Sequence, residues 1–251
     1  MMAVEMSWLL RRIPILSFFL LALVAACGDE AITRFQPTFT PGNETETISI
    51  VLAEDEIVLS GHLFGGQNEV GVILSHMQPN DQSAWFEFAQ SLADQGYAAL
   101  TFDFRGYGDS QGAKDFSTLD EDLREALRFM RDDRGLTQVF LIGASMGGTT
   151  SLVVAAQEDV AGVVAVSAPA RFEDQDALGA VAGVVEPKLF IASEDDTAAM
   201  LSLQELEEEA SGSTESERYP GNAHGTNLLQ SEHAPEFRTL IEEFLREQSR
   251  S

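Results

Sequence analysis

The sequence is poor in cysteine and in basic residues, and both shortages limit what the chain can be. Cys27 is its single cysteine, so no disulfide can form within the chain. Only 15 lysines and arginines oppose 41 acidic residues, which gives a formal net charge of −26. A surface this acidic repels phosphate backbones, so we expect no nucleic-acid partner. The hydrophobic fraction of 44% is ordinary for a globular protein and argues against a disordered or all-membrane chain.

The apolar segment near the N-terminus is too short for an ordinary membrane span. It follows Arg11 and Arg12 and contains about 14 residues, whereas a spanning helix needs roughly 20. A basic start, a short apolar stretch and small residues at its end predict a secretory signal over residues 1–26.

The end of this segment, Val24-Ala25-Ala26-Cys27, resembles the lipobox of bacterial lipoproteins. The resemblance implies cleavage before Cys27 and lipidation of that residue, which would explain an unpaired thiol at this place. We therefore expect an exported protein, anchored to the cell membrane through Cys27 on the extracytoplasmic side. An uncleaved signal anchor and an ordinary cleaved signal are the alternatives.

The next residues are typical of a linker. Residues 27–46 are rich in Thr, Pro, Gly, Asn and Glu and have no apolar periodicity, which predicts a flexible tether. The folded domain is expected over residues 47–251, a length that suits one α/β domain.

Within this domain, short apolar runs alternate with amphipathic stretches. We expect strands at 57–64, 70–75, 98–102, 139–143, 160–166, 188–193 and 217–219, and helices at 85–95, 119–131, 147–156 and 200–210. Several of these strands are apolar on both faces. The pattern predicts a mostly parallel, doubly wound α/β sheet with helices on both faces.

A candidate nucleophile lies in Gly143-Ala144-Ser145-Met146-Gly147, which matches G-x-S-x-G. In this nucleophile elbow a sharp strand-to-helix turn exposes the serine hydroxyl, and the glycines remove side chains that would collide. The pentapeptide alone is weak evidence, but an apolar run precedes it and a helical pattern follows. A dinucleotide site is a poorer interpretation, because G-x-G-x-x-G is absent here.

A serine hydroxyl needs a base, and the base needs an orienting carboxylate. Among the four histidines, His224 is the best candidate, since it lies in a loop before the C-terminal helix. His62 falls inside a strand pattern and His233 at a helix start. The order Ser, acid, His places the acid after the strand at 188–193, where the choice narrows to the carboxylates at 194–196.

A second motif points to a family. The segment 103–110, Asp-Phe-Arg-Gly-Tyr-Gly-Asp-Ser, resembles the D-x-R-G-x-G-x-S loop of the α/β-hydrolase superfamily. Together with the elbow, the chain from about Thr47 onward is similar to the dienelactone-hydrolase and esterase-like serine hydrolases of this superfamily. The family pattern G-x-x-D, with Ser193 in the place of the glycine, implies Asp196 as the acid of the triad.

The same resemblance implies an oxyanion hole built from two backbone N–H groups. Met146, directly after the nucleophile, supplies one. Gln78 corresponds to the second donor, in the segment Ser75-His76-Met77-Gln78 after the third strand, where Met77 replaces the usual glycine. The family uses the histidine equivalent to His76 to hold this loop, so a structural role is implied for it.

Many members of the superfamily carry a helical cap over the active site. Here about twenty residues, 167–187, connect two apolar runs. This length suits a loop and one short helix, so we expect no large cap domain.

Metal and cofactor chemistry has little support. No histidine or cysteine cluster has ligand spacing, and the acidic runs at 173–176 and 205–209 lack the calcium-loop pattern. We therefore expect neither a metal nor a cofactor.

These features predict a serine hydrolase that cleaves a small ester-like substrate through an acyl-enzyme intermediate. Ser145 would attack, His224 would act as base, Asp196 would orient it, and Met146 and Gln78 would bind the oxyanion. A carboxylesterase is the first interpretation. Thioesterase, dienelactone-hydrolase-like and peptidase activities, or a non-catalytic surface binding protein on the same fold, are the alternatives.

Overall fold

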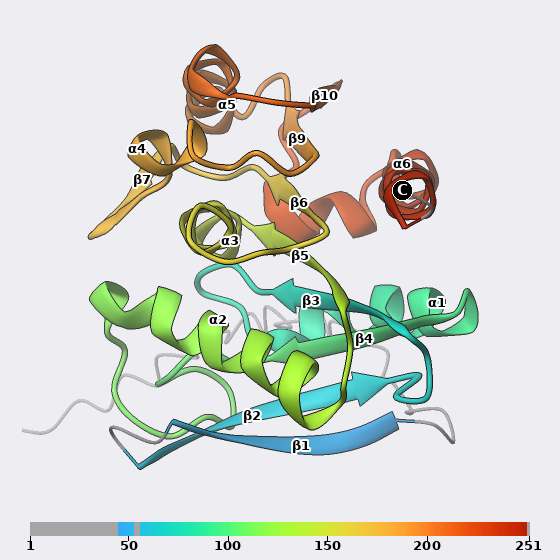
Figure 1. Cartoon of the computed structure of the whole chain (residues 1–251). Coiled ribbons are helices and arrows are strands. Elements are labelled where there is room, and N and C mark those ends of the chain that lie inside the picture. Colours follow the sequence, from blue (N-terminus) through green and yellow to red (C-terminus); the bar gives the residue numbers. More distant parts are fainter. Residues whose placement is uncertain (1–44, 53–55, 250–251) are drawn as a thin grey trace, which may run out of the picture. The chain divides into compact units, whose positions relative to one another are not determined.

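A computed structural model describes residues 45–52 and 56–249 (Figure 1). The predicted signal at 1–26, Cys27 and most of the predicted tether lie outside the described residues. The first strand begins at Thr45, so regular structure starts two residues before the predicted boundary at Thr47. In the described part, no helix is long and apolar enough to cross a membrane.

The domain is built on an eight-stranded sheet in the order β1-β2-β4-β3-β5-β6-β9-β10. The strands are β1 (Thr45–Leu52), β2 (Ile57–Phe64), β3 (Val70–Ser75), β4 (Tyr97–Phe102), β5 (Gln138–Ala144), β6 (Gly162–Val166), β9 (Lys188–Ser193) and β10 (Thr214–Tyr219). β2 pairs antiparallel with β1 and β4, and all other neighbours pair parallel. The predicted, mostly parallel sheet is confirmed.

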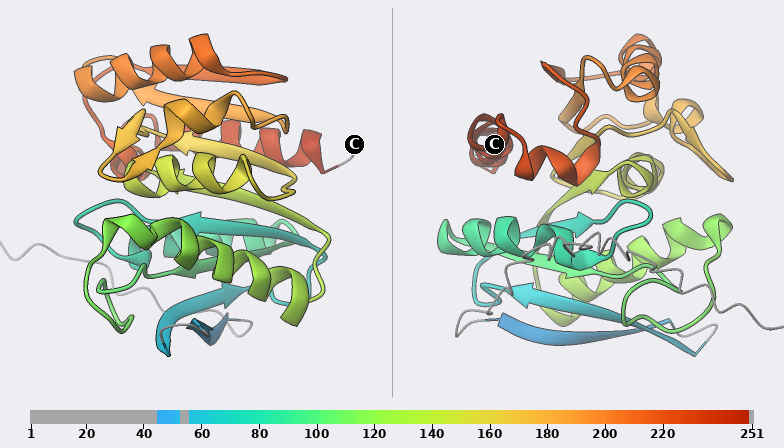
Figure 2. Two further views of the ribbon diagram at one scale, coloured as in Figure 1. Left: turned by 60° about the vertical axis from the view of Figure 1, so that its left-hand side comes forward. Right: turned by 180° about the vertical axis from the view of Figure 1, so that it is seen from behind.

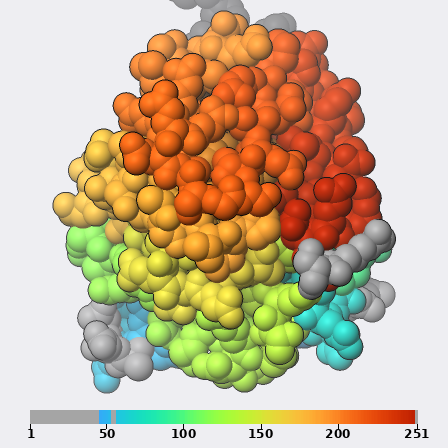
Figure 3. Space-filling view, turned by 45° about the horizontal axis from the view of Figure 1, so that its top comes forward, coloured from blue at the N-terminus to red at the C-terminus, as the bar shows by residue number. Residues whose placement is uncertain are grey.

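Helices cover both faces of the sheet, as predicted (Figures 1 and 2). α1 (Phe86–Asp94) and α6 (Ala234–Gln248) pack their buried side chains into one core, and α2 (Leu119–Arg128), α3 (Met146–Ala155), α4 (Ala177–Val181) and α5 (Thr197–Glu209) pack into the other. Figure 3 shows the β10 end of the sheet, where α5 with β10 (orange) and α6 (red) cover neighbouring parts of the surface.

Three local features differ from the sequence-based expectation. β1 was not predicted; it alternates buried Ile48, Ile50 and Leu52 with exposed residues and pairs with β2 along its whole length. The helix predicted over 119–131 is α-helical to Arg128 and ends in a π-helical turn, Phe129–Asp133. The connection at 167–187 contains a small hairpin besides its short helix.

That connection carries no large cap, as expected. It consists of the two-stranded β7 (Arg171–Phe172) and β8 (Gln175–Asp176), followed by α4. The Phe172 ring lies against Phe116, with ring centroids 5.3 Å apart. The segment therefore packs on the domain surface and does not form a separate covering domain.

β9 begins with a buried lysine. Lys188 is 1% exposed, and its ammonium donates hydrogen bonds to the Val184 and Glu186 carbonyl oxygens at 2.8 and 2.9 Å. Burial lowers the pKa of this amine. The two carbonyl bonds offset part of the cost of burying the charge and fix the chain as it enters the strand.

The strand ends determine where a site can form. Residues at the carboxyl ends of the parallel strands pair in register, Ser75 with Gly143, Ala144 with Val166, and Ser193 with Tyr219. From β3 the chain proceeds to β4 on one side, while β5 lies on the other. In open α/β sheets, ligands bind outside the carboxyl ends of the strands near such a reversal.

Candidate active site

Ser145 occupies a strained turn between β5 and α3. Its backbone has φ 47° and ψ −115°, a conformation that costs a non-glycine residue free energy. A Cβ at Gly143 would lie 2.2 Å from the Gly147 carbonyl oxygen, and one at Gly147 would lie 2.5 Å from the Ser75 carbonyl oxygen. Only glycine fits at both positions, so the G-x-S-x-G spacing follows from the close packing of this elbow.

His224 and Asp196 meet at the same edge of the sheet. The His224 Nδ1 and the Asp196 Oδ2 are 2.5 Å apart. An ionised carboxylate only accepts hydrogen bonds, so the imidazole donates through Nδ1–H and its Nε2 is the acceptor nitrogen. Asp196 follows β9 on a turn closed by its own N–H, which donates to the Ser193 carbonyl oxygen at 3.0 Å.

The other carboxylates considered from the sequence do not reach the imidazole. Glu194 and Asp195 are exposed, whereas the Asp196 side chain is 13% exposed. The two other histidines considered as bases have different partners. His62 in β2 shares a hydrogen bond with Gln82, and the His233 ring stacks on Tyr219 at the start of α6.

Backbone contacts place the His224 loop beside the elbow. A Cβ at Gly225 would lie 3.3 Å from the Ala144 Cβ, so the residue after His224 touches the residue before Ser145. Among residues 45–52 and 56–249, no hydrogen bond joins the Ser145 hydroxyl to His224. Catalytic hydrogen bonds are often long until substrate binds, so the absence of a Ser145–His224 hydrogen bond is compatible with His224 as the base.

Two backbone N–H groups in the segments beside Ser145 have no partner in the helices or the sheet that the structure describes. Met146 is the first residue of α3, where helix N–H groups have no intrahelical partner. Gln78 follows the end of β3. In the part of the chain that the structure describes, neither the Met146 nor the Gln78 N–H has a hydrogen-bond partner. Both donors are therefore available to a ligand.

Tyr107 links the residues that carry these two donors. Its hydroxyl lies 3.8 Å from the Met146 Sδ and hydrogen-bonds the Gln78 side chain. Burial raises the pKa of Tyr107, against a smaller opposing effect of the Gln78 bond, so the hydroxyl keeps its proton at neutral pH. The sequence did not predict that Tyr107 contacts both Met146 and Gln78, although Tyr107 lies inside the segment 103–110.

His76 connects two loops and has no free nitrogen. It is fully buried; the Phe104 N–H donates to its Nε2 at 3.1 Å, so its Nδ1–H donates to the Met77 carbonyl oxygen at 3.1 Å. Burial lowers the pKa of the ring, which stays neutral because protonation would place two hydrogens between Nε2 and an N–H donor. This geometry makes His76 a structural element of the loop after β3.

The segment 103–110 is held by buried charges. Asp103 accepts hydrogen bonds from the Gln82 backbone and side chain and from the Asp109 N–H. The Arg105 guanidinium donates to the Asp122 Oδ1 at 2.8 Å, and its backbone N–H donates to the Oδ2 at 2.8 Å. Burial raises the pKa of Asp122, while the Arg105 bonds oppose this. The motif thus acts as scaffold beside the site.

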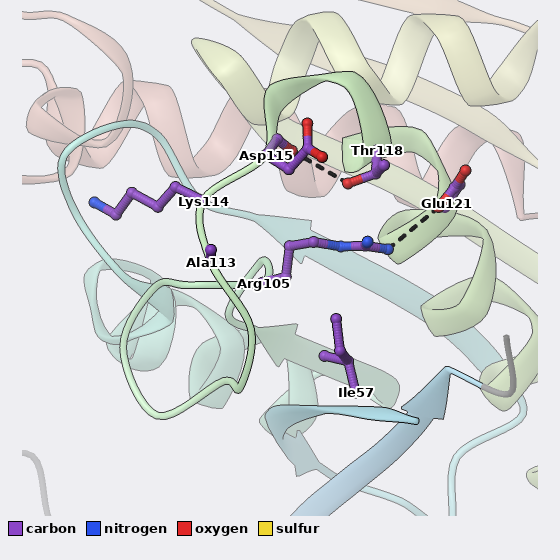
Figure 4. A pocket seen from close by; sticks show the side chains of 7 residues that line it. All are labelled: Ile57, Arg105, Ala113, Lys114, Asp115, Thr118 and Glu121. Atoms are coloured by element: carbon purple, nitrogen blue, oxygen red, sulfur yellow. Dashed lines mark hydrogen bonds and ion pairs between the residues drawn. The ribbon is translucent and has the colours of Figure 1, made fainter. Parts of the chain in front are cut away.

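A cavity of about 650 Å³ lies beside Arg105 and the residues that follow this loop (Figure 4). It is lined by Ile57, Arg105, Ala113, Lys114, Asp115, Thr118 and Glu121. Figure 4 shows the Lys114 side chain extending away from Arg105, whose guanidinium faces Glu121. Ser145, His224 and Asp196 do not line this cavity, so it is not the space in front of Ser145.

Within the described residues, no cluster of three metal-ligating side chains occurs.

The fold and this edge of the sheet define the class of protein, an α/β hydrolase. Residues 72–228 match the model of the family described as the alpha/beta hydrolase fold. The match covers more than half of the chain, and the protein therefore belongs to this family.

Sequence relatives extend the comparison over a shorter region. The chain is 29% identical over 103 residues to the uncharacterized protein YfhR of Escherichia coli O157:H7, and the K12 protein matches at 28%. The match covers 40% of this chain and 36% of the relative, so the chain spans about a third of the length of these curated relatives.

Solved structures share the fold at low sequence identity. The Pyrococcus furiosus esterase Pf2001 has a TM-score of 0.70 at 20% identity, covering 82% of this chain and 91% of its own. Est1E from Butyrivibrio proteoclasticus, solved with ferulic acid, has a TM-score of 0.67 at 15% identity, covering 81% and 100%. At these identities the likeness establishes the common fold.

Proposed function

We propose that this hydrolase is a serine esterase that cleaves a small ester-like substrate through an acyl-enzyme intermediate. The observation that carries the proposal is the Asp196–His224 hydrogen bond of 2.5 Å beside a strained nucleophile elbow. A binding protein would need neither a base held by a carboxylate nor a serine in a costly backbone conformation.

In the proposed reaction, the Ser145 Oγ attacks the ester carbonyl carbon while its proton passes to the His224 Nε2. Asp196 stabilises the imidazolium that forms and keeps the ring in its Nδ1–H tautomer. The Met146 and Gln78 N–H groups donate to the oxyanion; the removal of one such donor typically costs about 3–4 kcal/mol of transition-state stabilisation. The imidazolium then protonates the leaving alcohol.

Water completes the turnover. His224 removes a proton from water, the hydroxide oxygen attacks the acyl carbon, and the Ser145 oxygen leaves with the proton returned by the imidazolium. The acid product and the free serine are released. Thioester or amide substrates would follow the same steps, so the leaving group has to be determined by assay.

The short 167–187 connection supports small or flexible acyl groups as substrates, since no large cap covers the strand ends. The net charge of −26 should disfavour anionic substrates. Esters with neutral or cationic groups should therefore react faster, and salt should reduce the difference by screening.

A fluorophosphonate probe tests the proposal, because it labels an activated serine and leaves an inert one unmodified. The wild type should be labelled, and Ser145→Ala and His224→Ala should not. Ser211→Ala is a matched control, since Ser211 lies between α5 and β10 and its hydroxyl donates to the Ala182 carbonyl oxygen. An unlabelled wild type would contradict the proposed serine esterase and favour a binding protein on the same fold.

We also propose that the domain works outside the cytoplasm, attached to the membrane through lipidated Cys27. The support for this attachment is the sequence Val24–Cys27.

A further inference from the structure

The loop that carries His224 is fastened on both sides of the histidine by two buried serines. The Ser193 Oγ–H donates to the carbonyl oxygen of Ala223 at 2.6 Å. The Ser167 Oγ accepts a hydrogen bond from the N–H of Gly225 at 3.0 Å. Ala223 and Gly225 are the two chain neighbours of His224. Ser193 and Ser167 are 0% and 1% exposed.

Ser193 also holds the carboxylate partner of His224. Its carbonyl oxygen accepts the Asp196 N–H at 3.0 Å, which closes the turn after β9. The side chain of one residue therefore binds the histidine loop, while its main chain binds the aspartate turn. This residue stands where the family pattern G-x-x-D has glycine, which has no hydroxyl to offer.

Ser167 forms its hydrogen bond from a strained backbone conformation. It follows β6 with φ 49°, in the left-handed region that favours glycine. Its own N–H donates to the Ile191 carbonyl oxygen at 2.7 Å, so the backbone is fixed to β9. A strained non-glycine residue whose side chain bonds the residue next to His224 indicates that the hydroxyl is the reason for the serine.

Met77 also contacts the loop that carries His224. A Cβ at Gly225, where φ is 55°, would lie 2.6 Å from the Met77 Sδ, so this side chain presses directly on the backbone after His224. Met77 is the second position at which the chain departs from the family glycine. Ser193 and Met77, which replace the two family glycines, thus both contact residues that flank His224.

We propose that Ser193 and Ser167 are positioning residues that set the alignment of His224 with Asp196 and Ser145. The inference rests on the proposed function and names two residues that act through the base and do not touch the substrate. A displacement of about 1 Å in such a group can cost about 100-fold in rate.

The test uses Ser193→Ala and Ser167→Gly in the full-length protein, with p-nitrophenyl acetate as substrate. Glycine at 167 removes the hydroxyl and relieves the positive φ, so strain does not confuse the result. We expect kcat to fall about 10- to 100-fold with KM within about twofold of the wild type. Ser211→Ala, which loses an exposed serine-to-carbonyl bond of 2.8 Å away from the site, should leave kcat unchanged.

Two further measurements distinguish positioning from general support of the fold. In a His224→Ala background, Ser193→Ala should cause no additional loss of the residual rate, because the histidine through which it acts is gone. The downfield proton resonance of the His224 Nδ1–H, identified by its loss in His224→Ala, should weaken or move in both serine variants.

The inference is overturned if kcat stays at the wild-type value, if the losses in the double variant multiply, or if the proton resonance is unchanged. A wild type that hydrolyses no ester would instead refute the proposed function. The proton resonance would then still decide whether the two serines hold the His224–Asp196 pair.

Discussion

Replacing Asp196 by asparagine tests the acid of the site without disturbing the fold. Asparagine has nearly the same shape, and it is as good a helix N-cap as aspartate. The Asp196 side chain caps α5 by accepting the Ala199 N–H at 3.5 Å, and asparagine can keep this bond. We therefore expect Tm to change by no more than about 2 °C, for a stability change of a few tenths of a kcal/mol.

The effect on rate should be large. The hydrogen bond of 2.5 Å to His224 requires an acceptor, and an amide presented through its NH₂ group would favour the wrong tautomer of the imidazole. By analogy with the same change in a serine protease triad, kcat should fall about 10³- to 10⁴-fold. This corresponds to about 4–5.5 kcal/mol of transition-state stabilisation.

Asp195→Asn is the matched control, because its carboxylate is one residue away and exposed. It should retain kcat within about threefold. The assay is steady-state hydrolysis of p-nitrophenyl acetate, with fluorophosphonate labelling rates as a second readout and thermal melts for each variant. A crippled Asp195→Asn beside an active Asp196→Asn would show that the assignment of the acid is wrong by one residue.

Further predictions concern the scaffold, the pH dependence, the anchor and the substrate. Asp122→Ala should destabilise the protein by about 3–5 kcal/mol in urea unfolding, because it removes the buried carboxylate that accepts both the backbone and the guanidinium hydrogen bonds of Arg105, and the exposed Glu121 at 3.3 Å replaces neither; a loss below 1 kcal/mol would contradict this. Burial lowers the pKa of His76 from 6.5, so its contribution to stability is complete above pH 6.5 and is lost as the pH falls through the folded-state pKa. His76→Asn should flatten this part of the stability profile, and parallel profiles would refute the interpretation. Cys27→Ser should abolish metabolic labelling with a fatty acid, and equal labelling would exclude lipidation there. In a series of p-nitrophenyl esters, short acyl chains should react best; a preference for long chains with a rate jump above the solubility limit would contradict an uncapped site.

Long apolar patterns made most of the fold predictable. β2, β3 and β9 have the predicted bounds, because strands buried on both faces leave continuous apolar runs between polar turns. β1 escaped prediction, since it has only three buried residues, which alternate with exposed ones at the sheet edge next to a linker-like composition. The hairpin β7–β8 was too short to leave a periodic signal.

The candidate site left a signal in the sequence where a residue type is required by chemistry or by crowding. Ser145 could be proposed as the nucleophile because the G-x-S-x-G pattern reflects neighbouring glycines that have no room for a Cβ. The contributions of Ser193 and Ser167 could not, since each depends on one hydrogen bond to a residue 30 or 58 positions away. Serine is common in loops, and a sequence does not reveal which serine hydroxyl faces a distant backbone group.

The burial of Lys188 leaves the folded chain with one accessible lysine side chain for amine chemistry. The sequence has two lysines, and the other, Lys114, is exposed with its ammonium 3.8 Å from the centre of the Tyr107 ring. An N-hydroxysuccinimide dye should therefore attach to the folded domain at this one side chain. Tyr107 in turn contacts Met146, so the dye would sit next to the nucleophile elbow. Such a conjugate could report ligand binding by its emission, and amine coupling to a solid support would hold the domain in one orientation, at Lys114.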